Sequence, residues 1–112
     1  MVLTRKPKKE ELQLIQHIVE SSGNSVSDYY NESLRVQDLG QGSMGSLTLF
    51  PFGEIGETRT FGKELGYIQY KDMDGVNVIA TLYLDEYGKL YELDIWKTDY
   101  NNLISFSKHI DG

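Results

Sequence analysis

The chain of 112 residues has no cysteine, only two prolines and two histidines, and no long apolar run. Without cysteine it can form no disulfide framework, no zinc–thiolate site and no thiol nucleophile. This composition fits a reducing cytosol, and we expect a cytoplasmic protein. The basic N-terminus has no apolar segment of a signal peptide behind it, and no stretch approaches the length of a membrane span. We therefore expect no contact with a membrane.

Positive charge is scarce, because eleven Lys and Arg stand against seventeen Asp and Glu, for a net charge of −6. The imbalance is strongest between residues 72 and 99, where seven acids face two lysines. Such a field repels nucleic acid and attracts basic proteins, although an ordinary soluble acidic domain has a similar balance. The basic residues before position 10 are expected to form a solvated end of the chain.

The length suits a single domain over residues 1–112. Apolar residues at helical spacing predict one amphipathic helix over residues 8–21. Alternating stretches bounded by turn residues predict strands at 34–39, 44–50, 65–72, 76–84 and 89–97. Residues 26–33 fit either a short helix or a loop, 51–57 a loop, and the tail from 101 a return against the sheet edge. The expected architecture is α+β, an antiparallel sheet of four to five strands with the N-terminal helix packed on one face.

The most informative stretch runs from Val76 to Asp99 and reads as two strands joined by the turn 85–88. Successive residues of a strand point to opposite faces of a sheet. One face is then apolar, built from Val76, Val78, Ala80, Leu82, Leu84, Tyr91, Leu93 and Ile95. The other face presents Glu92, Asp94 and Trp96 beside Asn77, Thr81 and Tyr83.

An acidic sheet face with exposed aromatics suits the binding of a basic protein, since Tyr and Trp are enriched in interface hot spots. The alternative for Trp96 is packing beneath the tail. Stacking on nucleic acid would need basic residues between the aromatics, so no direct nucleic-acid contact is expected. The candidate partner-binding residues are Asp72, Asp74, Tyr83, Asp85, Glu86, Glu92, Asp94 and Trp96.

Two other kinds of chemistry are weaker hypotheses. The glycine-rich segment 40–46 suggests a small-molecule or nucleotide site, but it lacks the following helix and the Lys-Ser or Lys-Thr pair of a phosphate loop. Glu92 and Asp94 share a strand face at roughly 6–7 Å and resemble the carboxylate pair of a hydrolase, although an open face gives such a pair little cover. His17 and His109 are isolated. We expect no enzyme, no catalytic residue, no metal and no cofactor.

The run DGVNVIATLYLDEYGKLYELDIWKTDYNNLI, the upstream GSMGSL and the leading charged helix together resemble a family of small bacterial immunity proteins of toxin systems. The similarity is greatest to the immunity proteins of contact-dependent growth inhibition (CdiI-type) and is strongest from Asp74 to Ile104. The resemblance implies a cytosolic antidote that binds and neutralises the toxin domain of a cognate effector, commonly a nuclease. Our hypothesis is an immunity protein that covers the basic active-site surface of such a nuclease, with a tRNase as the suggested toxin. It carries over no catalytic residue.

Overall fold

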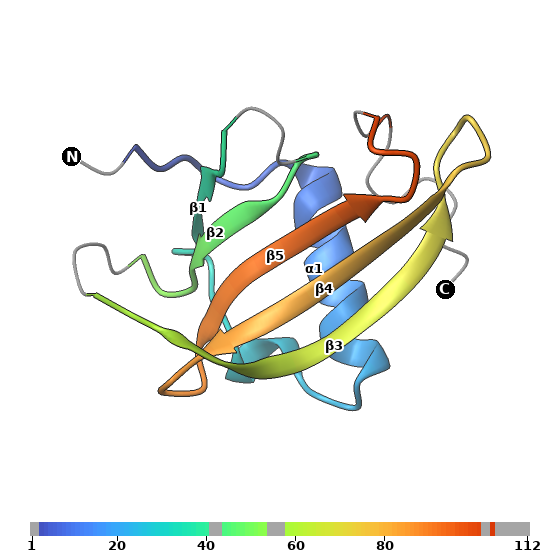
Figure 1. The fold of residues 1–112 in the computed structure, drawn as a ribbon. Coiled ribbons are helices and arrows are strands. Elements are labelled where there is room, and N and C mark those ends of the chain that lie inside the picture. The colour runs from blue at the N-terminus through green and yellow to red at the C-terminus, as the bar shows by residue number, and fades with distance from the viewer. Residues whose placement is uncertain (1–2, 41–43, 54–57, 102–103, 105–112) are drawn as a thin grey trace.

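The structure is a computed structural model that describes residues 3–40, 44–53, 58–101 and 104 (Figure 1). One helix, α1 (Lys9–Ser21), packs against a single antiparallel sheet, which confirms the predicted α+β architecture. Along the chain, α1 is followed by a short 3₁₀ helix η1 (Val26–Asp28) and by the strands β1 (Arg35–Asp38), β2 (Leu47–Phe50), β3 (Phe61–Lys71), β4 (Asn77–Asp85) and β5 (Leu90–Lys97). The order across the sheet is β1-β2-β5-β4-β3.

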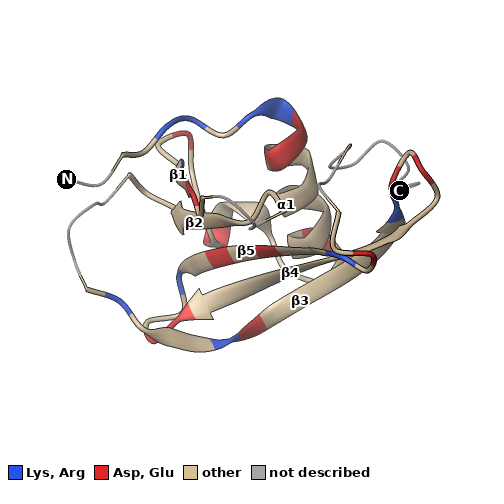
Figure 2. Cartoon of the chain, turned by 45° about the horizontal axis from the view of Figure 1, so that its top comes forward, with Lys and Arg blue, Asp and Glu red and all other residues tan. Residues whose placement is uncertain are grey.

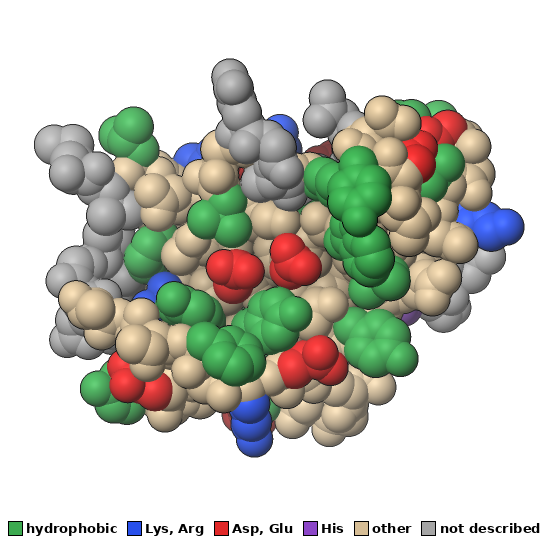
Figure 3. Space-filling model, viewed as in Figure 1, with side chains coloured by type: hydrophobic (Ala, Val, Ile, Leu, Met, Phe, Trp, Pro, Cys, Tyr) green, Lys and Arg blue, Asp and Glu red, His purple; other side chains and the backbone are tan. Residues whose placement is uncertain are grey.

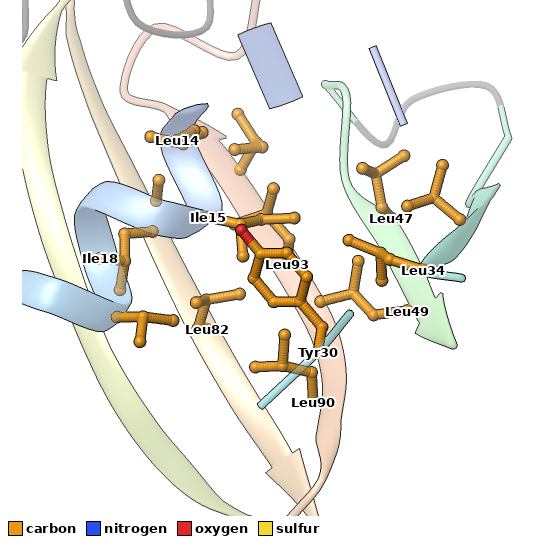
Figure 4. Packing of buried hydrophobic residues seen from close by; sticks show 14 of the residues in the cluster. Leu14, Ile15, Ile18, Tyr30, Leu34, Leu47, Leu49, Leu82, Leu90 and Leu93 are labelled. Carbon is orange, nitrogen blue, oxygen red and sulfur yellow. The ribbon is translucent and has the colours of Figure 1, made fainter. Parts of the chain in front are cut away.

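Two layers follow from the apolar patterns of the helix and the strands. The inward face of α1 is fully buried, and its residues Leu14, Ile15 and Ile18 face Leu82 and Leu93 of the sheet (Figure 4). Burial of side chains of this size is the dominant favourable term in folding, at roughly 1.5–3 kcal/mol each. Because α1 covers one side of the sheet, the opposite side has no helix over it among the described residues, and we call it the open face.

An arginine in the basic N-terminal segment is part of the folded structure, contrary to the expectation of a solvated end. Arg5 exchanges two backbone hydrogen bonds with Val36 of β1, at 2.9 and 2.8 Å. Its guanidinium donates to both carboxylate oxygens of Glu11 at 2.8 Å, while Glu11 also accepts the Lys8 amide at 2.7 Å. The buried Glu11 therefore satisfies an open backbone donor at the start of α1 and anchors the N-terminal segment.

Two predicted strands begin several residues away from the observed ones, and the other three differ by one residue at their ends. The strand expected at 44–50 begins at Leu47, because Met44 and Gly45 have φ of +57° and +100° and form a turn. The strand expected at 65–72 begins earlier, at Phe61, and its first residues pair with the end of β4 through register shifts. Residues 26–33, which fit either a short helix or a loop, begin with the 3₁₀ helix η1. The predictions for 41–43, 54–57 and most of the tail lie outside the described residues. None of the helices in the described ranges is long and apolar enough to cross a membrane.

Candidate protein-binding face

Four of the predicted contact residues meet on the open face, because antiparallel pairing sets them opposite one another. Tyr83 pairs with Glu92, and the next same-face pairs bring in Asp94 and Trp96. The neighbouring positions Leu82, Leu93 and Ile95 are buried on the helix side, which confirms the predicted alternation. The acidic positions of β5 lie in the middle of the sheet (Figure 2), and acidic side chains at the centre of the open face have hydrophobic groups on both sides (Figure 3).

Tyr91 departs from the predicted alternation. Tyr83 pairs with Glu92 but Leu84 pairs with Leu90, so Tyr91 has no counterpart on β4 and forms a β-bulge. The bulge gives the core position to Leu90, which is fully buried, and Tyr91 instead lines a cleft with Tyr83 and Glu92. The expectation that Tyr91 faces the core is therefore wrong, and the open face gains a third aromatic ring beside its acids.

Two clefts lie on either side of the acidic centre. The first, which we call the Tyr83 cleft, has a volume of about 340 Å³ and is lined by Phe61, Tyr83, Tyr91, Glu92 and Asp94. The second, which we call the Trp96 cleft, has a volume of about 550 Å³ and is lined by Leu39, Met44, Ser46, Asp94, Ile95, Trp96 and Tyr100. Asp94 lines both clefts, so the two clefts adjoin at this carboxylate. The face is therefore a pair of aromatic depressions separated by acids rather than a flat surface.

The acids of this face repel each other, and no basic side chain in the described part of the chain pairs with them. Burial raises the pKa of Glu92, and the charge of Asp94 raises it further. Burial likewise raises the pKa of Tyr83, with added contributions from Asp94, Glu64 and Glu92. Among the described residues no Lys or Arg pairs with Glu92 or Asp94. The Ser46 hydroxyl donates a long hydrogen bond of 3.4 Å to the Asp94 carboxylate. The centre of the open face thus carries negative charge that the fold does not neutralise.

Asp85, in contrast, stabilises a turn. Its side chain has no exposed surface and accepts hydrogen bonds from the Tyr87 and Lys89 amides at 2.8 and 3.0 Å. It also pairs with Arg59 at 3.4 Å. The expectation of an exposed contact is wrong for Asp85, because this carboxylate closes the β4–β5 turn. Glu86, one residue further on, is exposed at that turn and lines neither cleft.

Asp72 has a similar role at the opposite end of the sheet. Its buried carboxylate lies 3.0 Å from the Nζ atom of Lys97 and accepts the amides of Met73 and Ile104, each at 2.8 Å. Burial alone would raise the pKa of Asp72, but the hydrogen bonds from Ile104, Lys97 and Met73 outweigh it and lower the pKa. The expectation that Asp72 is exposed for a contact is therefore wrong as well.

Lys97 occupies the centre of this second network. Only 1% of its side chain is exposed, and its ammonium contacts Asp74 at 2.6 Å as well as Asp72 at 3.0 Å. The hydrogen bond to Asp74 contributes most to raising the pKa of Lys97, and the bond to Asp72 raises it further, while burial opposes both. Asp74 stays partly exposed, with 38% of its side chain accessible, but it lines neither cleft. The negative charges of Asp72 and Asp74 are therefore paired with Lys97 within the molecule.

Arg59 and Ser46 shape the open face although nothing in the sequence pattern singled them out. β2 and β5 share only two residue pairs, so their backbones need other partners beyond those pairs. Arg59 bridges the strands on one side by donating to the Leu49 carbonyl at 2.6 Å and to the Leu90 carbonyl at 2.9 Å. On the other side, the Ser46 hydroxyl accepts the Ile95 amide at 2.8 Å. Arg59 and Ser46 thus each supply, with one side chain, hydrogen bonds that backbone pairing does not make here. A single side-chain contact of this kind produces no periodic pattern in the sequence.

The structure gives little support to a metal site, to a hydrolase carboxylate pair or to a phosphate loop. The described residues contain no group of three His, Cys, Asp or Glu side chains placed to hold a metal ion. Glu92 and Asp94 do share one face, as a hydrolase would need, but they line shallow depressions of an open sheet. The segment 40–46 leads into strand β2 rather than a helix, so it provides no helix N-terminus for a phosphate.

Comparison with known proteins places the chain in a family. A family model described as a domain of unknown function, DUF6984, matches residues 4–107. Searches of the curated proteins and of the solved structures each returned no match. Because the matched region covers nearly the whole chain, this protein belongs to the DUF6984 family.

Proposed function

We propose that this protein is an immunity protein that binds a basic bacterial toxin domain, a nuclease such as a tRNase, and covers its active-site surface. The observation that carries the proposal is the acidic centre of the open face, where Glu92 and Asp94 have no basic partner among the described residues. The resemblance of the 74–104 region to CdiI-type immunity proteins supports the same conclusion. In this role the protein needs tight binding and no chemistry of its own.

The charge and shape of the open face suit such a partner. A nuclease needs a positive surface to hold the phosphates of its substrate. An acidic surface speeds association with it and excludes wrong partners by charge, while Tyr and Trp side chains supply contact energy near the centre of the interface. The molecule measures 38 × 32 × 23 Å. A face of that extent can provide the roughly 800 Å² that each partner contributes to a standard interface.

A capture experiment with matched charge variants tests the proposal. The tagged protein would be expressed in its native host beside two variants, Glu92→Lys/Asp94→Lys on the open face and Glu20→Lys/Glu32→Lys. Both variants change the net charge equally, but Glu20 and Glu32 are exposed on α1 and on the loop that follows it. We expect the unaltered protein and the control variant to retain one basic protein in equal amounts after a high-salt wash. The open-face variant should lose it.

Toxicity provides the second part of this test. The captured protein, expressed alone, should arrest growth and degrade RNA or DNA, and co-expression of the unaltered protein should restore growth. The proposal is overturned if no basic partner is retained, if the captured protein has no toxic activity, or if both variants retain it equally.

A small-molecule site is the second candidate, because the Trp96 cleft adjoins the glycine-rich segment. Its volume of about 550 Å³ lies within the range of roughly 300–1,000 Å³ typical of ligand pockets. Asp94 in its lining disfavours phosphate and favours an uncharged or cationic ligand. Thermal-shift screening with nucleosides and nucleotides tests this candidate, since a ligand that binds only the folded state raises the Tm. A shift that survives Trp96→Ala would exclude the cleft.

A further inference from the structure

We propose that the Tyr83 cleft is an arginine-binding subsite, which receives one arginine side chain of the partner between its aromatic walls and its acidic floor. This inference rests on the proposed function for the identity of the partner, since it assigns the chemistry of one contact within that interface. The cleft joins three aromatic rings, from Phe61, Tyr83 and Tyr91, to the carboxylates of Glu92 and Asp94.

The aromatic walls are fixed by contacts within the protein. Phe61 of β3 meets Tyr83 of β4 edge-to-face, with ring centroids 5.5 Å apart and planes at 71°. Tyr91 is held from the other side, because its hydroxyl donates to the Arg59 carbonyl at 3.4 Å and its ring packs against the Arg59 guanidinium. These contacts orient the rings before a partner arrives, which reduces the ordering that binding requires.

Beside the cleft, the protein already holds one guanidinium against an aromatic ring, that of Arg59 against Tyr91. The Arg59 guanidinium lies 5.2 Å from the ring centroid of Tyr91 and 5.2 Å from that of Phe50. Arg59 does not neutralise the cleft, however, because it pairs with Asp85 and donates to two backbone carbonyls. A second guanidinium would therefore lie beside Glu92 and Asp94, two carboxylates that form no ion pair within the described residues.

The acidic floor is arranged for a planar cation with several donors. Glu92 and Asp94 are two residues apart on β5 and project from the same face, at roughly 6–7 Å by strand rise. The raised pKa of Glu92, caused by burial and by Asp94, means that a bound cation would relieve an existing repulsion. Arginine suits the site better than lysine, since a guanidinium stacks on aromatic rings and offers five donors in a fixed plane.

The cleft is large enough to admit one arginine side chain. Its volume of about 340 Å³ is at the low end of the range of roughly 300–1,000 Å³ found for small-molecule pockets. Interface energy is concentrated where a buried anchor fills a pocket, and arginine is among the residues enriched there.

An NMR titration of the isolated protein tests the subsite without the toxin. The probe is N-acetyl-arginine methylamide, and the matched control is N-acetyl-citrulline methylamide, which has nearly the same shape but no charge. We expect saturable shifts of the amides of Tyr83, Tyr91 and Glu92 with a Kd in the millimolar range. Binding of the citrulline probe should be at least tenfold weaker, and the lysine analogue should bind more weakly than arginine.

Variants locate the site and separate this inference from the proposed function. Glu92→Gln/Asp94→Asn should abolish the shifts, whereas Glu32→Gln, at an exposed acid outside the cleft, should leave them unchanged. Equal shifts from the arginine and citrulline probes, shifts confined to residues outside the cleft, or no shifts at all would overturn the subsite. Arginine binding without any toxin partner would support the subsite and reject the immunity role, and toxin binding without arginine binding would do the reverse.

Discussion

Removing the charge of Glu92 should stabilise the protein, although it removes a residue of the binding face. Burial and the neighbouring Asp94 raise the pKa of Glu92 above its ordinary value of 4.5. The folded state therefore binds this proton more readily than the unfolded chain, so stability falls as pH rises from about 4.5 through the folded pKa. The cost is therefore greater at neutral pH than in acid, and Glu92→Gln removes it.

The part of the gain that comes from repulsion by Asp94 follows from the separation of the two carboxylates, and relief of the burial of the charge adds to it. Two like charges about 6.5 Å apart repel by roughly 0.6 kcal/mol in water and about 2.5 kcal/mol at an effective dielectric constant of 20. Solvent reaches the open face and screens the pair, so the lower end applies and we expect a gain of about 0.5–1 kcal/mol. For a domain of this size that corresponds to a rise of roughly 2–5 °C in Tm.

Thermal unfolding followed by circular dichroism at pH 7 and at about pH 3.5 provides the measurement. Glu92→Gln should melt above the unaltered protein at pH 7, and the two should melt together at the lower pH, where the glutamate is protonated in both states. Glu86→Gln removes the same charge from an exposed turn and should change Tm little at either pH. The reasoning is refuted if Glu92→Gln melts at the same or a lower temperature at pH 7, or if its gain persists at pH 3.5.

Three further predictions concern the contacts that hold the sheet together, all measured by urea or thermal unfolding. Arg59→Ala should cost about 3 kcal/mol, because it removes the side-chain donor of the Leu49 and Leu90 carbonyls and the ion-pair partner of the buried Asp85. Arg59→Lys should recover little, since one ammonium cannot reach both strands. Gly62→Ala should cost about 2 kcal/mol, because the added methyl group would overlap the Asp85 carbonyl; an unchanged Tm would contradict this close approach. Lys97→Met should lower the Tm, and adding Asp72→Asn should restore part of the loss. Since its partners raise the pKa of Lys97 above 10.5, its contribution should be complete below that pH and disappear as pH rises through the folded pKa.

The part of the structure that follows from periodicity was accessible from the sequence. Alternation in β4 and β5 predicted which side chains face α1, and it correctly assembled Glu92, Asp94 and Trp96 on the other side. Periodicity cannot indicate where a strand gains an extra residue, so the bulge at Tyr91 was missed. Nor does the presence of an acid near a turn reveal whether its carboxylate faces solvent or caps backbone amides, as Asp85 does.

The contact residues outside the clefts show a further limit of sequence reasoning. The acids of the 72–74 turn looked like surface charge because Lys97, their partner, is more than twenty residues away along the chain. Arg59 likewise connects two strands that are distant from each other in sequence. Long-range pairings of single side chains depend on the complete three-dimensional arrangement, and no local pattern encodes them.

The narrow junction between β2 and β5 has a consequence for how the native state opens. At that junction Leu47 pairs with Leu93 and Thr48 with Glu92, so the β1–β2 ribbon makes few backbone hydrogen bonds to the rest of the sheet. The side chains of Arg59 and Ser46 add to these bonds, and buried residues of the ribbon such as Leu47 and Leu49 pack into the shared core. Such a ribbon can detach while the β3–β4–β5 meander stays paired, so its amide hydrogens should exchange with solvent sooner than those of β4. The sheet would then consist of a stable β3–β4–β5 meander and a β1–β2 ribbon that opens separately. The lining of the Trp96 cleft includes Met44 and Ser46, so this cleft would change shape whenever the ribbon opens.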